Sequence, residues 1–407
     1  MKRLFARHRL DIRPHHLVHA VVAVTAAGAD RAAAQVEAMW SPEGSALACY
    51  SVRSGFHLLL AALDLPRGSE VMFSAVTHPD MPRIAAHHGL VPVPVDLDPD
   101  TLAPTPAAVA RAITAQTRIF VVAHLFGGRV DLAPMAAICR PHRVLLVEDC
   151  AQSFAGETWG DDLAGASMFS FGILKTATAL GGAVLTVRDG ALLDRMREIQ
   201  RGWPLQTRLA HLKRIAQTAA FVALTRPLPY GAVARLLGDR FDGVVNGAVK
   251  AFPSASTEDL VGRLEHRPNA PLLALLRHRL EGFDHARLLA RAASGERLAA
   301  MLPEGLHVGG FALDHSHWLF PVVAADPDAL IATARAAGFD AARSASSVTA
   351  VVAPPERPEL EPRRARGLMA NLVFLPAYPE LPAGALDELR LALEGHDVHA
   401  HVANLAG

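Results

Sequence analysis

The chain has 407 residues, of which 40 are Lys or Arg and 40 are Asp or Glu, so its formal net charge is zero. About half of the residues are hydrophobic (51%) and 20% are charged, which is typical of a folded globular protein rather than a disordered one. A chain without net positive charge gives no reason to expect a nucleic-acid partner. Its three cysteines, Cys49, Cys139 and Cys150, lack metal-ligand spacing and favour a reducing, cytoplasmic environment over a disulfide framework.

The N-terminal region combines early basic residues with an apolar run at 17–28. Because this run starts late, contains His19 and is followed by charged residues, we expect a packed or amphipathic helix rather than a signal peptide. A second apolar segment, 215–237, is interrupted by Arg226 and two prolines, and no run reaches the roughly 20 apolar residues needed to span a bilayer. We therefore expect no integral membrane segment, and a buried helix pair at 215–237 rather than a membrane-surface or lipid-binding element.

Between residues 45 and 187, short apolar runs alternate with amphipathic ones. The runs expected as strands are 70–76, 90–98, 118–127, 144–153, 168–172 and 181–187, and the helices between them are 54–65, 81–89, 104–114 and 131–142. This alternation predicts a layered α/β fold with a mostly parallel sheet. The ligand crevice of such a sheet lies outside the carboxyl ends of its strands, where Thr77, His124 and Asp149 fall.

The pattern changes after residue 190. We expect residues 191–250 to be helical and residues 267–301 to form one long helix or two. Strands expected at 317–325 and 372–378 and helices at 327–338 and 383–395 indicate a smaller α+β domain, with the Pro- and charge-rich stretch 353–367 as a solvated loop. The chain then divides into an N-terminal helical segment 1–44, a large domain 45–200, a variable apolar helical region 201–264 and a small C-terminal domain 265–407.

One lysine stands out in a chain that nearly always uses arginine. Only Lys2, Lys175, Lys213 and Lys250 are lysines, and Lys175 follows an apolar strand and precedes a glycine pair. Arginine cannot lose its proton near neutral pH, whereas the pKa of a buried lysine falls readily and its amine can then act as a nucleophile. The sequence therefore favours a chemical role for Lys175.

Three features stand in the order that a pyridoxal phosphate site needs. Lys175 supplies an amine, and Asp149 at a strand end supplies a carboxylate for the pyridine nitrogen. Ser54-Gly55 opens a predicted helix, where free N–H groups favour a phosphate. Asp149 at a strand end could also simply cap the element that follows it.

Six short motifs follow one another between residues 50 and 185. They are Ser54-Gly55-Phe56, Ser74–His78, Asp96–Thr101, Ala123–Gly127, Val147–Gln152, and Phe169–Lys175 with Gly181-Gly182 after it. In this order they resemble the DegT/DnrJ/EryC1/StrS family of pyridoxal-phosphate-dependent aminotransferases, best known as sugar aminotransferases. Two later stretches, 267–284 and 374–379, are similar to the family's C-terminal helix and strand. The resemblance implies a PLP-dependent transferase of fold type I, with a large domain and a smaller α+β domain.

Carried over to this chain, the resemblance assigns the two catalytic residues and the contacts of the cofactor ring. Lys175 would bind pyridoxal 5'-phosphate as an internal aldimine and shuttle the proton between substrate and cofactor. Asp149 would pair with the pyridine nitrogen, His78 would stack on the ring, and Gln152 would approach it beside its hydroxyl group.

The resemblance also assigns the phosphate and substrate contacts. His124 and Arg267 are the candidates for substrate binding, although His124 could equally be a hydrogen-bonded packing residue. The phosphate would be held by Ser54, Gly55, Phe56 (through its backbone N–H) and Ser170.

Several positions depart from the family pattern. Phe56 replaces a Thr or Ser, so one phosphate hydroxyl is missing, and Ala179-Leu180 stand in a loop that is one residue short and lacks the usual acid. Glu265 replaces an asparagine that often reaches the neighbouring subunit, and Phe154 replaces a histidine. These changes fall in the substrate-facing and intersubunit parts, so the resemblance favours the cofactor more firmly than a sugar substrate.

The resemblance implies that glutamate or glutamine gives an amino group to the cofactor and that a keto acceptor, by analogy a keto-sugar, receives it. Two alternatives are another PLP-dependent reaction, such as a lyase or decarboxylase acting on a non-sugar substrate, and a catalytically silent PLP-fold binding protein. Because sites of this fold are built between subunits, we expect a homodimer. His396, His399 and His401 resemble a metal-binding tract, but residues at a chain end are commonly poorly ordered and we expect no metal.

Overall fold

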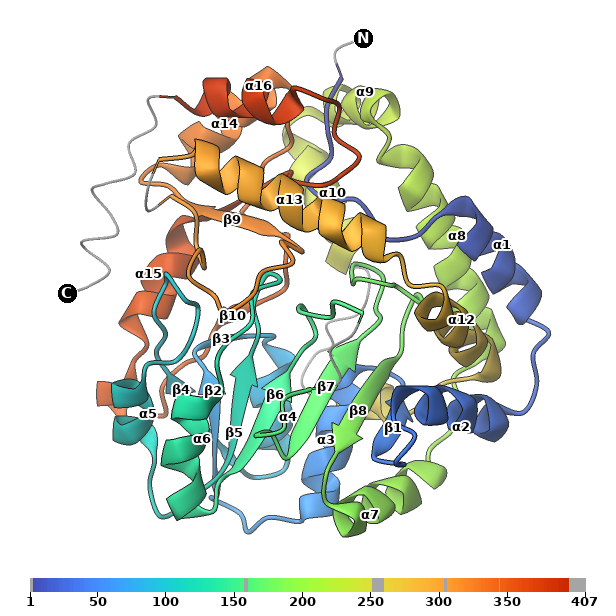
Figure 1. Cartoon of the computed structure of the whole chain (residues 1–407), viewed down its shortest axis with the longest axis vertical. Coiled ribbons are helices and arrows are strands. Elements are labelled where there is room, and N and C mark those ends of the chain that lie inside the picture. The colour runs from blue at the N-terminus through green and yellow to red at the C-terminus, as the bar shows by residue number, and fades with distance from the viewer. Residues whose placement is uncertain (1–2, 157–159, 251–259, 304–305, 344, 395–407) are drawn as a thin grey trace.

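A seven-stranded sheet forms the centre of the larger domain in the computed structural model, which describes residues 3–156, 160–250, 260–303, 306–343 and 345–394 (Figure 1). Its strands are β1 (Ala46–Cys49), β2 (Glu70–Ser74), β4 (Val91–Val95), β5 (Thr117–Ala123), β6 (Leu145–Asp149), β7 (Ala166–Ser170) and β8 (Ala183–Val187). They lie in the order β1-β8-β7-β6-β5-β2-β4. Neighbours from β7 to β4 pair in parallel, while β8 is antiparallel to both β1 and β7. The predicted α/β fold with a mostly parallel sheet is confirmed.

Helices cover both faces of this sheet, because successive side chains of each strand point to opposite sides. On β2, Val71 packs into one apolar cluster and the adjacent Met72 into another. Burial on both faces explains why the strands are nearly continuous apolar runs in the sequence. One face is covered by α3 (Val52–Leu63), α4 (Asp80–His87) and α7 (Gly190–Arg201), and the other by α5 (Pro106–Ala112) and α6 (Ala133–Cys139).

The two N-terminal helices pack beside β1 together with a helix from much later in the chain. These helices are α1 (Pro14–Ala23), α2 (Ala29–Trp40) and α12 (Ala270–Glu281). Phe154 lies in their shared apolar core and packs its ring 5.8 Å from that of Trp40 and 5.3 Å from that of Phe283, measured between ring centres. The phenylalanine that departs from the family pattern at this position therefore fills an apolar core.

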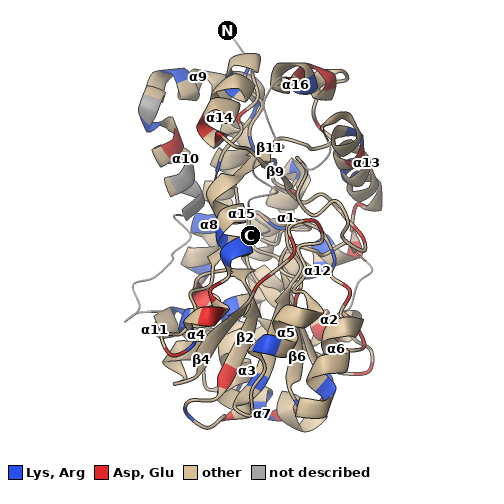
Figure 2. Cartoon of the chain, turned by 90° about the vertical axis from the view of Figure 1, so that its left-hand side faces the viewer, with Lys and Arg blue, Asp and Glu red and all other residues tan. Residues whose placement is uncertain are grey.

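The smaller domain is built on an antiparallel pair of strands, β9 (Phe320–Val323) and β11 (Leu372–Leu375). Figure 2 shows these strands and their helices above the large sheet, with positions of acidic and basic residues spread along the ribbon. A second short pair, β3 (Val76–Thr77) with β10 (Thr349–Ala350), joins the two domains beside the carboxyl ends of the parallel strands. The helices of this domain are α13 (His285–Met301), α14 (Pro327–Ala337), α15 (Arg363–Asn371) and α16 (Ala385–Leu393).

Helix α15 corrects the expectation that residues 353–367 form only a solvated loop. Its inner face buries Ala365 and Leu368. The carboxylate of Asp96 accepts hydrogen bonds from the backbone N–H groups of Arg364 and Ala365 (3.1 and 3.0 Å), which satisfies the first turn. The capping carboxylate lies far away in the sequence, so the local pattern of Pro and charge did not indicate a helix.

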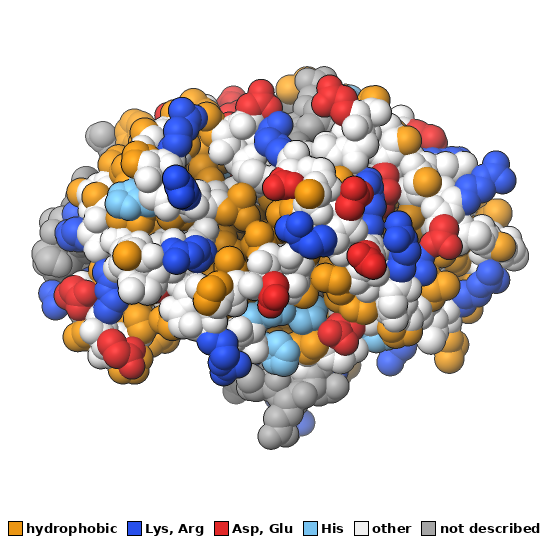
Figure 3. Space-filling view, turned by 90° about the horizontal axis from the view of Figure 1, so that it is seen from below, with side chains coloured by type: hydrophobic (Ala, Val, Ile, Leu, Met, Phe, Trp, Pro, Cys, Tyr) orange, Lys and Arg blue, Asp and Glu red, His pale blue; other side chains and the backbone are white. Residues whose placement is uncertain are grey.

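The described residues of the apolar region 201–264 are mostly helical, as expected, but its segment 215–237 is not a buried helix pair. Its helices are α8 (Arg208–Leu224), α9 (Pro227–Leu237), α10 (Phe241–Lys250) and α11 (Leu260–Leu264). Leu224, Leu228 and Leu236 are 51%, 47% and 86% exposed, so this face is open in the single chain. Among the described residues, helices that combine the length and the apolar character required to cross a membrane do not occur. On the face of the molecule in Figure 3, hydrophobic side chains are interspersed with charges of both signs.

Candidate active site

A cavity of about 750 Å³ opens at the carboxyl ends of the parallel strands, between the large sheet and the small domain. It brings together most of the residues proposed from the sequence, although they come from separate loops. Those that line it are Thr77, His78, His124, Asp149, Gln152, Ser170 and Lys175. This is the edge of the sheet where ligands of open α/β sheets bind.

Lys175 lies in the loop between β7 and β8, and its side chain points into this cavity. Burial lowers the pKa of its amine to about 8, with the Asp149 carboxylate opposing that shift and the Arg53 guanidinium adding to it. The Nζ atom lies 4.1 Å from the centre of the Trp318 ring. An amine of this kind can be unprotonated and nucleophilic near neutral pH, which arginine cannot be.

The short loop before Gly181-Gly182 keeps two non-glycine residues in the left-handed region, Ala177 (φ 53°) and Leu180 (φ 65°). Such conformations cost about 1–3 kcal/mol each and persist where surrounding contacts enforce them. Here the Asp11 carboxylate accepts a hydrogen bond from the Ala177 N–H (2.7 Å), and Thr178 Oγ1 accepts one from the Leu180 N–H (3.1 Å). The loop that carries Lys175 is therefore held in one strained shape.

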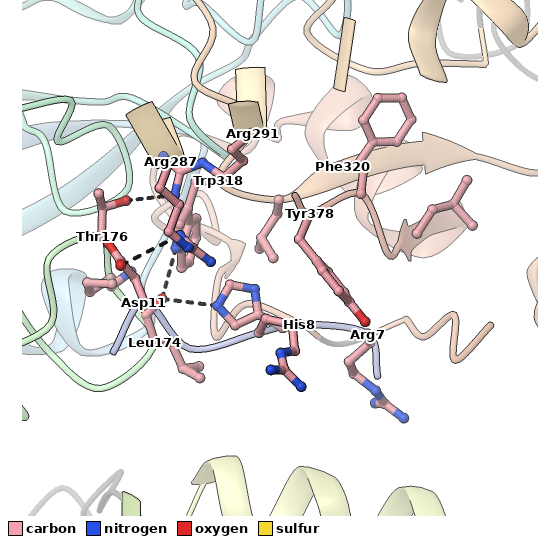
Figure 4. Close-up of a pocket in the computed structure, with 15 residues that line it drawn as sticks. Arg7, His8, Asp11, Leu174, Thr176, Arg287, Arg291, Trp318, Phe320 and Tyr378 are labelled. Carbon is pink, nitrogen blue, oxygen red and sulfur yellow. Dashed lines mark hydrogen bonds and ion pairs between the residues drawn. The ribbon is translucent and has the colours of Figure 1, made fainter. Parts of the chain in front are cut away.

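The loop is also supported from behind by the N-terminal segment and α13 (Figure 4). A ring nitrogen of His8 lies 3.2 Å from the Leu174 carbonyl oxygen, which also accepts a hydrogen bond from the indole N–H of Trp318 (2.8 Å). Arg291 donates to Thr176 Oγ1 (3.1 Å). A space of about 20 Å³, enough for one water molecule, remains among these side chains.

Asp149 ends β6 and is 8% exposed. Its Oδ1 atom accepts a hydrogen bond from the Ala151 N–H (3.0 Å), so it shapes the turn after the strand rather than capping a helix. Burial raises the pKa of its carboxyl group, against the stabilising effect of that N–H and of the Lys175 charge. A buried carboxylate at this strand end can pair with a protonated ring nitrogen.

The structure places Ser54, Gly55 and Phe56, the predicted phosphate contacts, inside helix α3 and not among the residues that line the cavity. Helix α3 begins earlier, with Ser51 as its N-cap, and the Ser51 hydroxyl accepts a hydrogen bond from the Ser54 N–H (3.1 Å). The proposed residues are buried against the sheet, and a Cβ on Gly55 would lie 2.5 Å from a methyl carbon of Leu185. The residues of this helix start that line the cavity are Ser51, Val52 and Arg53.

Arg53 and His78 meet at Asp80, whose carboxylate is fully buried. An Nη atom of Arg53 lies 2.6 Å from the Asp80 carboxylate, and the Asp80 N–H donates to Nδ1 of His78 (3.1 Å). Burial, and then the nearby Arg53 charge, lower the pKa of His78 to about 4. The imidazole is therefore a neutral, flat ring at the cavity wall.

Gln152 and Ser170 have polar groups at the cavity wall, and both also bond within the chain. The side-chain oxygen of Gln152 accepts from the Phe126 N–H (2.9 Å), and its amide nitrogen donates to Ser346 Oγ (3.4 Å). Ser170 Oγ accepts from the Gly172 N–H (3.4 Å). Nearby, Thr77 Oγ1 is buried without a hydrogen-bond partner among the described residues. A polar ligand in the cavity can supply this hydrogen bond.

The side chain of His124 is not free to bind a substrate. Its Nδ1 atom accepts a hydrogen bond from the Val130 N–H (2.9 Å), so the proton lies on Nε2, which donates to Glu148 (2.8 Å). Both side chains are fully buried. Burial alone would raise the pKa of Glu148, but the His124 hydrogen bond and the Asp161 N–H together lower it to about 2. Of the two readings of His124, the structure supports the packing role.

Arg267 is directed away from the cavity. Its backbone pairs with the 204–206 segment, and its side chain forms an ion pair with Asp30 on α2. The cavity instead takes arginine side chains from positions outside the motifs, namely Arg53, Arg83, Arg214 and Arg263. Arg214 donates to the Tyr50 hydroxyl (2.6 Å) and to the Leu180 carbonyl oxygen (3.3 Å).

The mostly parallel sheet and the smaller α+β domain are those of the type I PLP-dependent transferase fold, as the resemblance implied. Residues 34–208 match the model of the DegT/DnrJ/EryC1/StrS aminotransferase family, which is the family that the motifs of this segment resemble. The L-glutamine:2-deoxy-scyllo-inosose aminotransferase of Micromonospora echinospora is 36% identical over 201 residues. That match covers 47% of this chain and 47% of the relative, so it spans about half of either protein.

Two solved structures share the fold along nearly the whole chain. The sugar aminotransferase CalS13 from Micromonospora echinospora is 19% identical, with 97% of this chain and 99% of that chain covered and a TM-score of 0.63. The ntda protein of Bacillus subtilis, solved with bound cofactor pmp, is 17% identical, with 94% and 82% covered and a TM-score of 0.68. At these identities the likeness shows the fold alone.

Proposed function

We propose that this protein is a pyridoxal-phosphate-dependent aminotransferase that moves an amino group from glutamate or glutamine to a keto acceptor. The observation that carries the proposal is the meeting of Lys175, Asp149 and His78 in one cavity with the first turn of α3. An amine of lowered pKa, a buried carboxylate, a neutral flat ring and a helix N-terminus are the four groups that this cofactor requires.

The residues present fit the cofactor. Lys175 would hold its aldehyde carbon, Asp149 its pyridine nitrogen and His78 one face of its ring. Its phosphate would be held by the N–H groups at the start of α3, by the Arg53 guanidinium and by Ser170. An arginine at this helix start supplies a charge where only hydroxyl and N–H donors were expected. The unpartnered Thr77 Oγ1 supports a polar ligand in the same space.

When bound, pyridoxal phosphate withdraws electrons from the carbon that carries the amino group, so that its proton becomes acidic. Lys175 is the base that would accept this proton and return it, because an amine with a pKa of about 8 is near the operating pH. Asp149 would keep the ring nitrogen protonated. Trp318 covers the lysine from the side of the small domain and limits the access of water.

For the acceptor we infer a polyhydroxylated ketone of the keto-sugar type. The curated relative is named for L-glutamine and 2-deoxy-scyllo-inosose, a donor and an acceptor of these classes. The cavity supports a polar substrate because Arg83, Arg263, His266, Ser346 and Ser347 line it. These side chains can bind hydroxyl and carboxylate groups.

We also propose that the protein is a cytoplasmic homodimer. The exposed leucines on α8 and α9 give a face suited to a second copy, and all three cysteines are buried and unpaired.

The test uses purified protein and pyridoxal phosphate. Addition of glutamate or glutamine should convert the bound cofactor stoichiometrically to the pyridoxamine form, seen by absorbance, and borohydride should trap the cofactor on Lys175. Lys175→Ala should abolish both results, whereas Lys213→Ala, at an exposed lysine, should change neither. A protein that binds the cofactor but converts it with neither donor would favour a lyase or decarboxylase. A protein that does not bind it would be a silent member of the family.

A further inference from the structure

Three histidines of the small domain turn their rings toward one another, away from the Lys175 cavity. They are His307, His315 and His317, and one nitrogen of each lies within 4.8 Å of those of the other two. The ring centres of His315 and His317 are 4.0 Å apart, and that of His307 lies 5.8 and 5.4 Å from them.

Each of these rings has a buried nitrogen without a hydrogen-bond partner among the described residues. The atoms are Nε2 of His307, Nε2 of His315 and Nδ1 of His317. Buried polar atoms in native proteins are nearly always satisfied, and an exception calls for a ligand, a water or an ion. Three rings that meet at one place, each with such a nitrogen, call for a shared ligand.

The fold constrains the rings strongly. His307 stacks on Phe320, with ring centres 4.5 Å apart. His317 has a φ of 45°, in the left-handed region that few side chains adopt. Its ring fits against α13 only because residue 295 is glycine, since a Cβ there would lie 2.1 Å from His317 Cγ. A strained backbone at such a cluster is typical of a functional site.

We propose that His307, His315 and His317 form a binding site for Zn²⁺. Three imidazoles without a carboxylate suit a borderline cation such as Zn²⁺ and not Mg²⁺ or Ca²⁺, which prefer oxygen ligands. A tetrahedral ion held in this way keeps a fourth position for water or another ligand. Burial lowers the pKa of each ring, to about 4 for His307, about 3 for His315 and about 2 for His317, so their lone pairs are available at neutral pH.

One contact must change when the metal binds. Nδ1 of His315 accepts a hydrogen bond from the His317 N–H (3.0 Å), which places the ring proton on Nε2. Coordination through Nε2 moves that proton to Nδ1 and breaks this bond. Binding of the metal is therefore coupled to the backbone of the turn that leads into Trp318.

This coupling gives the metal a positioning role. His317 directly precedes Trp318, whose ring lies 4.1 Å from Lys175 Nζ. A metal that holds His315 and His317 fixes this turn and thereby the side of the cavity formed by the indole.

The test uses full-length protein without an affinity tag. It should bind one equivalent of Zn²⁺ or Co²⁺, and X-ray absorption should show imidazole nitrogens around the zinc. His307→Gln should weaken the binding by at least about 100-fold, because even the loss of a partner outside the coordination shell costs 10–100-fold. His315→Gln is a second variant, for use if the first does not fold.

Two matched controls locate the metal. His142→Gln removes an exposed histidine elsewhere and should leave the affinity unchanged. Substitution of His396, His399 and His401 by Gln, in the tract that lies outside the described residues, should also leave it unchanged. If the full-length protein binds no Zn²⁺, or if binding survives His307→Gln and is lost with the C-terminal substitutions, the proposal is overturned.

Discussion

The indole of Trp318 contacts both Lys175 and the residue before it. Its ring centre lies 4.1 Å from Lys175 Nζ, and its N–H donates to the Leu174 carbonyl oxygen (2.8 Å). A residue of the small domain thus both covers the amine and holds the backbone that carries it. A shift of the small domain therefore changes both the contact of the indole with Lys175 and its hydrogen bond to the Leu174 carbonyl oxygen.

Substitution of Trp318 should separate these two contacts. Trp318→Phe keeps an aromatic ring and loses the hydrogen bond, so the free energy of unfolding should fall by about 1 kcal/mol. Trp318→Leu also loses the contact of the ring with the ammonium group, worth about 0.5–2 kcal/mol, and should be less stable than the Phe variant. Urea unfolding of both proteins measures the difference. Equal stability of the two variants would show that the contact between ring and lysine contributes nothing.

The two charges beside Lys175 should move its titration in opposite directions. Arg53 lowers the pKa of the amine, so Arg53→Gln should raise the midpoint above about 8. Asp149 raises that pKa, so Asp149→Asn should lower the midpoint. The amine reacts only when unprotonated, so the rate of its modification should rise with pH through each midpoint.

This titration is measured in the cofactor-free protein, by mass spectrometry of the peptide that contains Lys175 after reaction with an acylating reagent. The exposed Lys213 serves as the internal control, because neither substitution should change the rate of its modification. A shift of both variants in one direction would contradict the assignment of these two charges.

The start of α3 should hold the phosphate through Arg53 rather than through Ser54. Arg53→Gln removes a charged donor at the cavity wall and should weaken the affinity for pyridoxal phosphate by about 10–150-fold, the equivalent of about 1.5–3 kcal/mol. Arg53→Lys should recover part of this loss. Ser54→Ala, on the buried side of the helix, should leave the affinity almost unchanged. Equilibrium titrations measure these affinities. If Ser54→Ala weakens the affinity for pyridoxal phosphate more than Arg53→Gln does, the phosphate is held by Ser54 and not by Arg53.

The buried pair of Glu148 and His124 should dominate the loss of stability in acid. The pKa of Glu148 in the folded protein is about 2, below its ordinary value of 4.5. The ionised Glu148 therefore contributes roughly 3 kcal/mol to the free energy of unfolding above pH 4.5. This contribution is lost as the pH falls toward 2.

Glu148→Gln removes the titrating group, so the free energy of unfolding should be lower at pH 7 and should fall less steeply in acid. Asp162→Asn is the control, because Asp162 is 96% exposed and its ion pair with Arg188 lies on the surface. If the free energy of unfolding falls with decreasing pH to the same extent in Glu148→Gln and Asp162→Asn, protonation of Glu148 is not the cause of the loss of stability in acid.

The sequence predicted the layered fold and the central part of the cavity, because both depend on short local patterns. Apolar runs of strand length alternate with helices, Asp149 and Ser170 are the last residues of β6 and β7, and Lys175 lies in the loop after β7. The start of α3 was predicted too late in the sequence because the helix start was assigned to the Ser54-Gly55 pair. The true helix start, Ser51-Val52-Arg53, has no glycine and resembles the family pattern less.

Other features depend on contacts between distant residues and left no local signal. His124 has a packing role because its ring accepts a hydrogen bond from the Val130 N–H and donates one to Glu148. Helix α15 begins where the Asp96 carboxylate accepts hydrogen bonds from its first N–H groups. The histidine cluster depends on the space left by Gly295 in α13. None of these partners can be identified without knowing the three-dimensional arrangement.

The N-terminal segment has a consequence for how the protein folds during synthesis. His8 and Asp11 contact the Lys175 loop 166 positions later in the chain, and Arg7 forms a buried ion pair with Asp340, 333 positions away. Residues 7–11 are therefore translated long before the segments that they contact. The loop that carries Lys175 gains its final support only after the small domain has been translated, so an incomplete chain would carry Lys175 without the contacts that hold it in place.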